Sequence, residues 1–316
     1  MIQEAFRLSS PADGLPLGGL WILPEIPPKA VIQLCHGMCE RKERYLPLMN
    51  DLAQRGFACV IHDHRGHGES VRAREDLGYF YQNGADALLA DIGAINRLAH
   101  ERFPGLPLIL FGHSMGSLAV RAFARRHDDR IDGLIICGSP SRPTGLAAGH
   151  WLVFHLGLLR GEHARCAFAD RLVMGSFNRA FANEGANAWL STDPAVAEAY
   201  NNDPLCSFTF TLNGYDALLT LMAQAYAHDG WLVRNPDLPV LFVSGEDDPC
   251  RISHKKFLQA VEHMKTRGYA DVSWKIYPGM RHEIMNERGR EEVVDDLSAF
   301  CEKCCPAAPS SKESGV

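Results

Sequence analysis

The sequence of 316 residues lacks the features of several protein classes. Its longest interior apolar run, 151–159, is broken by His155 and is far shorter than the ~20 residues that cross a bilayer. Lys and Arg number 32 against 38 Asp and Glu, without a basic stripe, so we expect no nucleic-acid partner. The first ten residues lack the charge and apolar pattern of a secretory signal, which favours a cytoplasmic location.

Ten cysteines are present, but they form no pattern of disulfides or metal ligands. Cys35, Cys59 and Cys137 stand inside apolar runs, where a free thiol packs as a small hydrophobic group. Cys301 and Cys304 have CxxC spacing, but no second Cys or His pair accompanies them. We therefore predict free thiols and no metal.

Short apolar runs alternate with segments of helical periodicity. The runs are 31–35, 57–61, 108–111, 134–137, 240–243 and 272–276, and helical spacing is found in 45–52, 88–98 and 293–300. This alternation predicts an α/β fold with a mostly parallel sheet flanked by helices.

One interval breaks this alternation. About 95 residues separate the fourth run from the fifth, whereas α/β connections usually take about 2–6 residues plus a helix. We interpret 141–235 as an inserted helical cap and 1–140 with 236–303 as the core. Within the cap, Asp193 and Pro194 are typical of a helix start. Residues 304–316 have a Pro/Ser bias and predict a disordered tail.

A nucleophile motif lies between a predicted buried strand and a predicted helix. Residues 112–116 read GHSMG, and they follow LILF and precede an apolar helical pattern. GxSxG in this context forms a tight turn that exposes the serine hydroxyl at the helix N-terminus. Ser114 is therefore the candidate nucleophile.

A serine nucleophile needs a base and an acid that orients the base. His282 follows the predicted strand 272–276, at the edge where open α/β sheets place ligands. The fifth run leads into Glu246, Asp247 and Asp248, and spacing alone does not choose among these carboxylates. The chain order serine, acid, histidine is that of an α/β-hydrolase.

An oxyanion hole needs two N–H donors. The Met115 N–H directly follows the nucleophile and is the first candidate. The second is the Met38 N–H, because Gly37 after the first predicted strand lets the backbone approach closely; an ordinary turn glycine is the alternative.

Several segments together resemble a known family. They are HGMCERKERY at 36–45, DHRGHGES at 63–70, GHSMGS at 112–117, DPLCSFTFT at 203–211, GEDDP at 245–249 and YPGMRHEIMNE at 277–287. From Gly18 to Cys301 the chain resembles the monoacylglycerol lipase and lysophospholipase branch of the serine α/β-hydrolases. The resemblance implies Ser114, Asp248 and His282 as the catalytic residues and Met38 and Met115 as the oxyanion donors, with Asp247 as the alternative acid.

The resemblance also bears on substrate binding. It places Glu40 and Arg44 near the polar end of the acyl pocket, although a solvated ion pair is the alternative. Members of the family commonly have His after this Glu, whereas Arg41 stands here, which leaves the preference for a head group open.

Two further groups of residues have simpler interpretations. His62, His64 and His67 match the RGHG turn of the family, so we do not interpret them as a metal site. Cys39 and Cys250 neighbour the predicted oxyanion and acid loops; inert packing is the favoured interpretation, and inhibition by thiol reagents is the alternative.

We predict a serine ester hydrolase that needs no cofactor and acts on a monoacylglycerol or lysophospholipid. A carboxylesterase for short or xenobiotic esters is the nearest alternative, followed by a peptidase resembling proline iminopeptidase and by a ligand-binding homologue without turnover. The apolar residues of 151–159 either pack on the core or form a lipid-facing rim that contacts a membrane surface.

Overall fold

The structure is a computed structural model that describes residues 1–305. Eight strands form one sheet in the order β1-β2-β4-β3-β5-β6-β7-β8. The strands are β1 (Ile2–Ser9), β2 (Pro16–Leu23), β3 (Val31–Cys35), β4 (Ala58–His62), β5 (Leu108–His113), β6 (Gly133–Cys137), β7 (Val240–Gly245) and β8 (Val272–Tyr277). β2 runs antiparallel to β1 and β4, and the strands from β4 to β8 pair in parallel, which confirms a mostly parallel sheet.

Helices cover both faces of the sheet, so its central strands are buried and mainly apolar. Every residue of β3 to β7 is buried. Successive side chains point to opposite faces: Leu108 and Leu110 join one hydrophobic cluster, and Ile109 and Phe111 join the other. The first cluster includes α2 (Gly84–Arg102), α3 (Met115–His127) and α8 (His254–Thr266), and the second includes α1 (Leu46–Gln54) and α9 (Arg290–Lys303).

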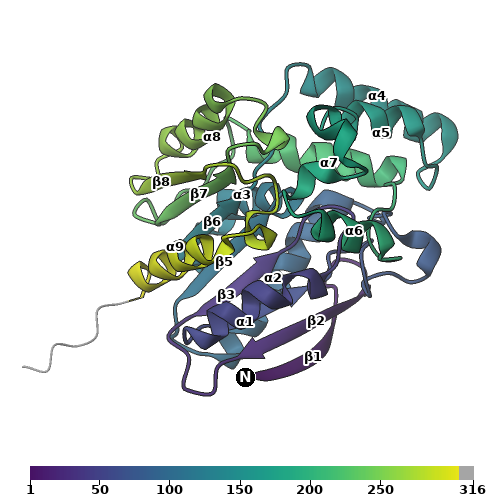
Figure 1. Ribbon diagram of the computed structural model, residues 1–316. Helices are drawn as coiled ribbons and strands as arrows, with labels where there is room; N and C mark the ends of the chain where they lie inside the picture. The colour runs from purple at the N-terminus through teal and green to yellow at the C-terminus, as the bar shows by residue number, and fades with distance from the viewer. Residues whose placement is uncertain (306–316) are drawn as a thin grey trace, which may run out of the picture.

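The long connection between β6 and β7 is helical, as the sequence predicts. It contains α4 (Leu146–Arg160), α5 (Ala167–Met174), η4 (Arg179–Glu184), η5 (Ala188–Leu190), α6 (Pro194–Asn202) and α7 (Leu212–Ala225). The Asp193 carboxylate accepts the Ala195 N–H (3.1 Å), which confirms the expected helix start. Figure 1 shows α4, α5 and α7 gathered on the side away from the N-terminus. α7 packs on α2 and α3 as well as on α4 and so links this connection to the core.

Short 3-10 helices complete the described chain. They are η1 (Lys42–Tyr45), η2 (Arg74–Asp76), η3 (Asp128–Arg130), η6 (Pro249–Arg251) and η7 (Ile284–Asn286). None of the helices within residues 1–305 has the length and apolar character needed to cross a membrane. The predicted disordered tail, 304–316, falls outside the described residues except for Cys304 and Cys305. The division into core and cap at 140/141 and 235/236 stays a prediction.

Candidate active site

The nucleophile turn joins β5 to α3. Ser114 has a φ of +53°, which is a costly conformation for a residue with a side chain, and its N–H donates to the Cys137 carbonyl (3.0 Å). A Cβ atom on Gly112 would lie 2.4 Å from the Gly116 carbonyl oxygen. A Cβ atom on Gly116 would lie 2.2 Å from the Cys35 carbonyl oxygen. Both glycines are thus required for the turn to pack between its neighbours.

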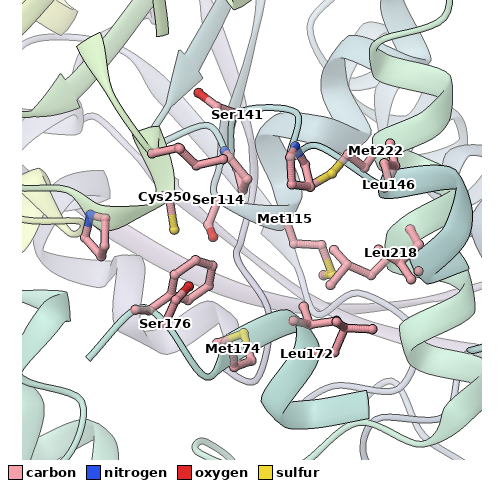
Figure 2. A pocket seen from close by; sticks show the side chains of 18 of the residues that line it. Ser114, Met115, Ser141, Leu146, Leu172, Met174, Ser176, Leu218, Met222 and Cys250 are labelled. Atoms are coloured by element: carbon pink, nitrogen blue, oxygen red, sulfur yellow. The ribbon is translucent and has the colours of Figure 1, made fainter. Parts of the chain in front are cut away.

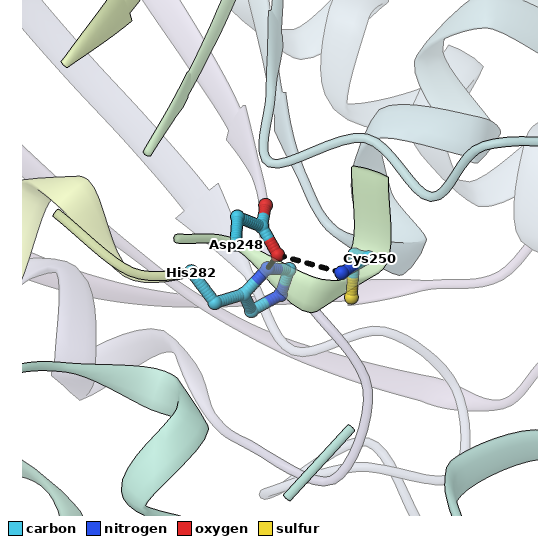
Figure 3. Close-up of side chains that lie close together, drawn as sticks. All are labelled: Asp248, Cys250 and His282. Atoms are coloured by element: carbon cyan, nitrogen blue, oxygen red, sulfur yellow. Dashed lines mark hydrogen bonds and ion pairs between the residues drawn. The ribbon is translucent and has the colours of Figure 1, made fainter. Parts of the chain in front are cut away.

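Asp248 and His282 meet at the carboxyl ends of β7 and β8. The Nδ1 atom of His282 lies 3.0 Å from Asp248 Oδ1, as Figure 3 shows. The carboxylate also accepts the Cys250 N–H (2.9 Å) and the Ser244 hydroxyl (3.0 Å). Because the aspartate is buried and held at three points, it orients one tautomer of the imidazole.

The loop after β7 separates the three candidate acids. Glu246 and Asp247 are exposed, and only Asp248 among the three is buried beside His282. The Asp247 N–H donates to the Met280 carbonyl (2.9 Å), which sets the register of this loop against the histidine loop. Spacing alone left this choice open because one residue of register reverses which carboxylate points inward, whereas the family resemblance implied Asp248.

Burial and mutual attraction shift the pKa values of this pair in opposite directions. Burial disfavours the imidazolium, but the Asp248 carboxylate outweighs it and raises the pKa of His282 well above the usual value. Burial opposes the ionisation of Asp248, yet the positive charge of His282 and the hydrogen bonds lower the pKa of this carboxyl. The pair therefore favours a carboxylate next to a basic imidazole.

The loop between β3 and η1 lies next to Ser114. Met38 lines the same cavity as Ser114 and Met115. Met115 is the first residue of α3, so its N–H has no acceptor one turn earlier in the helix. A Cβ atom on Gly37 would lie 2.6 Å from Glu40 Oε1 and 3.1 Å from Ser114 Cβ, so the close approach of this loop depends on glycine. The structure thus brings the predicted oxyanion residues together around the nucleophile.

Glu40 and Arg44 form a buried charge network rather than a solvated pair. The Glu40 carboxylate accepts the Gly37 N–H (2.5 Å), the Tyr45 hydroxyl (2.9 Å) and the Arg44 Nε–H (3.1 Å). Arg44 also pairs with Glu283 (2.5 Å) and lies over the Tyr200 ring. Burial opposes the ionisation of Glu40, but its hydrogen bonds and cationic neighbours hold the pKa of its carboxyl well below the usual value.

Arg41, the departure from the family pattern, points to the cap. Its Nε–H donates to the Asp203 carboxylate (2.7 Å), and it pairs with Glu43 as well. The Ser207 N–H donates to the Cys39 carbonyl (3.0 Å) next to it. These two contacts join the segment before α7 to the loop that carries Met38.

Ser114 lies where two cavities meet. The larger has a volume of about 240 Å³ and is lined mainly by apolar side chains. Figure 2 shows, among these, Leu146 of α4, Leu172 and Met174 of α5, and Leu218 and Met222 of α7. The smaller has a volume of about 20 Å³, which is enough for a water-sized group, and is lined by the polar side chains of Glu40, His282 and Glu283. Met38, Ser114, Met174 and Trp189 line both cavities.

Sequence reasoning missed three residues of this site. Trp189 in η5 lies 4.8 Å from His282, measured between ring centroids, and Tyr200 lines the small cavity. Both come from the cap, where no motif marked them. Glu283 carried a signal that was overlooked, because it directly follows the predicted base.

Cys250 lies beside Asp248 and His282. Among residues 1–305, Asp248, Cys250 and His282 are the one group of three potential metal ligands whose donor atoms lie within 4.8 Å of one another. The carboxylate and the imidazole already bond to each other. Burial raises the pKa of the Cys250 thiol to about 11, and burial raises that of Cys39 well above the usual value. Both thiols are therefore protonated at neutral pH, which makes them weak nucleophiles.

The sheet order, the crossover helices and the serine turn define an α/β-hydrolase. Residues 26–289 match the family model described as serine aminopeptidase, S33. The chain therefore belongs to this family of serine hydrolases.

Individual relatives show which branch of the family this chain is similar to. Monoglyceride lipase of Homo sapiens is 31% identical over 282 residues, which cover 87% of this chain and 82% of that protein. Monoacylglycerol lipase of Mycolicibacterium smegmatis is 26% identical over 282 residues, which cover 88% of this chain and 89% of that protein. The predicted resemblance to the monoacylglycerol lipase branch is confirmed.

The fold is shared with solved structures at lower identity. A thermostable carboxyl esterase from Bacillus coagulans in complex with glycerol has a TM-score of 0.88 at 24% identity and covers 97% of this chain and 100% of its own. A soluble variant of monoglyceride lipase from Saccharomyces cerevisiae has a TM-score of 0.75 at 20% identity, with 97% of each chain covered.

Proposed function

We propose that this protein hydrolyses carboxylic esters with an apolar acyl group and a small polar alcohol, of the monoacylglycerol or lysophospholipid type. The observation that carries the proposal is the position of Ser114 between a large apolar cavity and a small cavity to which Glu40, His282 and Glu283 contribute polar side chains. An ester carbonyl at Ser114 would direct its acyl chain into the first cavity, and the second, which holds a water-sized group, would take one hydroxyl of its alcohol. The monoacylglycerol lipases of human and Mycolicibacterium smegmatis among the relatives support the same substrate class.

In the proposed mechanism, Ser114 is the nucleophile and His282 is the general base. The imidazole takes the hydroxyl proton while Oγ bonds to the ester carbon, and Asp248 stabilises the imidazolium that forms. The N–H groups of Met38 and Met115 stabilise the negative charge that develops on the carbonyl oxygen. His282 then protonates the leaving alcohol, and water, deprotonated by the same imidazole, releases the acid from Ser114.

The charges around the small cavity favour an alcohol over an amine. A peptidase that recognises a free amino group needs an unpaired acid near the nucleophile. The two carboxylates of this cavity, Glu40 and Glu283, are both paired with Arg44. This pairing lowers the attraction for an ammonium group, which disfavours the peptidase alternative.

We also propose that the cap contacts the lipid surface from which the substrate comes. Trp151, Leu158 and Leu159 of α4 are 62%, 68% and 83% exposed, and Phe168 and Leu172 of α5 are exposed as well. Leu172 also lines the large cavity, so the apolar surface continues into the acyl site. A continuous apolar face next to a cavity entrance is typical of docking at a lipid interface.

The experiment that tests the function is a substrate series with labelling of the nucleophile. Hydrolysis of 4-nitrophenyl esters from acetate to palmitate, of 1-monoacylglycerols and of lysophosphatidylcholine is measured for the wild type and Ser114→Ala. We expect a fluorophosphonate to label Ser114, activity to peak at medium or long chains, and monoacylglycerol to be cleaved. A peak at acetate or butyrate without glycerol-ester turnover would establish the carboxylesterase instead, and absence of labelling and turnover would favour a binding protein.

A further inference from the structure

The loop that carries Met38 has no regular secondary structure to support it. Residues 36–41 lie between β3 and η1, and Cys39 in this loop has a φ of +55°. A backbone donor stabilises an oxyanion only if it is held close to the position of the charge before the reaction begins. Apart from the Ser207 N–H, which donates to the Cys39 carbonyl (3.0 Å), the support for the Met38 N–H comes from side chains around the loop.

His36 holds the residue before Met38. Its Nδ1 lies 2.7 Å from the Gly37 carbonyl oxygen, and its Nε2 lies 2.8 Å from the His64 backbone nitrogen. Because the amide of His64 can only donate, Nε2 is the acceptor and Nδ1 carries the proton that is donated to Gly37. The Gly37 N–H donates to Glu40, so both polar backbone groups of Gly37 are bonded to side chains.

His67 holds the residue after Met38 in the same manner. Its Nε2 accepts the Cys39 N–H (3.2 Å), and its Nδ1 lies 3.0 Å from the Arg65 carbonyl oxygen. Its ring packs among aromatic rings with centroid separations of 5.5 Å to Phe80, 5.4 Å to Phe208 and 5.3 Å to Phe210. The imidazole is therefore fixed in position and can fix Cys39 in turn.

We propose that His36 and His67 are positioning residues that clamp the backbone on either side of Met38 and so hold its N–H toward the oxyanion. This inference rests on the proposed function, in which Met38 supplies one of the two donors. Both imidazoles are fully buried, and neither lines the large or the small cavity. They act through the loop and do not touch the substrate.

The clamp needs neutral imidazoles in one tautomer. Each ring uses one nitrogen as a donor and the other as an acceptor, and a second proton would replace the acceptor by a donor facing an N–H group. Burial lowers the pKa of His67 to about 3 and also lowers that of His36, despite the attraction of Glu40 and Asp63. The acceptors are therefore available at neutral pH.

His62 provides a matched control from the same group of histidines. It is also fully buried, and its ring lies 5.0 Å from that of His64. Within residues 1–305, neither of its ring nitrogens makes a hydrogen bond. Replacing it by leucine changes the packing of the group without removing a contact to the loop.

The test compares His67→Leu, His67→Gln and His62→Leu with the wild type. The kcat and KM for 4-nitrophenyl butyrate, the Ki of an alkylboronic acid that forms a tetrahedral adduct with serine, and the melting temperature are measured. We expect His67→Leu to lower kcat about 10–100-fold, with KM changed less than about threefold, because a misplaced donor weakens transition-state binding. The Ki of the boronic acid should rise by a similar factor.

The conservative variant separates positioning from packing. A glutamine oxygen at position 67 can accept the Cys39 N–H, so His67→Gln should recover most of kcat and of the boronic acid affinity. His62→Leu should leave both near wild type even if its melting temperature falls. The proposal is overturned if His67→Leu changes only stability, or if His62→Leu lowers kcat equally. A wild type that turns over no ester would instead overturn the proposed function.

Discussion

The surroundings of Ser114 and the outer surface of the cap differ in what they bury. Around Ser114, the polar groups of Glu40, Asp248 and His282 are almost fully buried, and each makes hydrogen bonds to defined partners. On α4, large apolar side chains such as Trp151 and Leu159 are exposed instead. The polar groups around Ser114 are shielded from water and held in fixed orientations, as catalysis requires. The cap instead exposes apolar surface that a lipid or another apolar partner would cover.

One glycine of the serine turn and one of α4 differ in how much space surrounds the position that a Cβ atom would take. Gly116 at the start of α3 has backbone oxygens within 2.6 Å of the place where its Cβ would lie. Gly149 in α4 has no heavy atom closer than the Leu172 Cδ2 at 3.8 Å. Tight packing thus defines the geometry of the serine turn, whereas position 149 on α4 has room for a side chain.

Loss of the nucleophile should have the largest effect on activity. We expect Ser114→Ala to reduce kcat by about 10⁵–10⁶-fold, because the acyl-enzyme cannot form. The substitution removes one hydroxyl at the wall of the two cavities without changing the backbone, so the melting temperature should stay within a few degrees. Ester turnover above about 1% of wild type, measured on protein free of other esterases, would contradict the assignment of Ser114.

The acid loop offers a matched pair of substitutions. Asp248→Asn should reduce kcat by about 10⁴-fold, because the amide no longer favours the tautomer in which Nδ1 carries the proton. Asp247→Asn should leave kcat within about twofold, since Asp247 is exposed. Equal losses from both variants, measured with the same ester, would show that the loop rather than the Asp248 carboxylate is needed.

The raised pKa of His282 predicts the pH dependence of activity. Only the neutral imidazole accepts the serine proton, so kcat/KM should fall as the pH decreases through a value above 6.5, the usual pKa of histidine. Asp248→Asn should move this limb of its residual activity to lower pH. A wild-type profile that is flat from pH 5 to 8 would contradict His282 as the base.

The same shift has a consequence for stability. Because the folded pKa of His282 lies above its unfolded value, its contribution is present below the unfolded pKa and is lost as the pH rises through the folded value. The lowered pKa of Asp248 has the opposite effect. Its contribution to the free energy of unfolding is present above the unfolded pKa and is lost as the pH falls through the folded pKa. Denaturant titrations of the wild type and Asp248→Asn at several pH values measure the free energy of unfolding and so test the contributions of both residues.

Adding one methyl group should change the free energy of unfolding in opposite directions at the serine turn and on α4. Gly116→Ala forces a Cβ against backbone oxygens and should reduce the free energy of unfolding by about 1–3 kcal/mol. Gly149→Ala places the methyl group in open space within a helix and should raise that free energy by up to about 1 kcal/mol. Urea titration of both variants provides the measurement, and a loss of similar size at both positions would contradict the comparison.

The smallest expected effect concerns the exposed apolar residues of the cap. Leu158→Ser together with Leu159→Ser should weaken binding to phosphatidylcholine vesicles about tenfold, since less apolar area leaves water on docking. Turnover of soluble 4-nitrophenyl butyrate should stay within about twofold. Ile26→Ser is the control, because Ile26 is also exposed but precedes β3 and so lies at the opposite end of the sheet from Ser114. Equal vesicle binding by wild type and the double variant would exclude α4 as the docking surface.

The fold was predictable from periodicity in most places. The six predicted runs correspond to β3 to β8, because most residues of these strands are apolar. The prediction did not include β1 and β2. β1 is largely exposed at the edge of the sheet and mixes charged with apolar residues, so it presents no continuous apolar run. β2 begins with Pro16 and contains two adjacent glycines, and its apolar run, 20–23, was overlooked.

The candidate site was predictable where function depends on local backbone geometry. A serine between glycines after a buried strand, and a histidine after the last strand, could be placed from sequence because strand order brings both to one edge of the sheet. Trp189 and Tyr200 could not, because they reach the site through a long connection without a repeating pattern. The role of Glu40 as a partner of the Gly37 N–H was also hidden, since the sequence shows a charge but not what it bonds.

The sequence by itself thus determined the α/β order, the serine turn and the late histidine, because short-range sterics and hydrophobic periodicity act within a few residues. Spacing left the acid open and only the resemblance implied Asp248, which the tertiary structure places beside His282. Only the tertiary structure decided that Arg41 turns to Asp203 and that two cavities meet at Ser114. These outcomes depend on the register of loops and on contacts between segments far apart in the chain, whose energies no local pattern records.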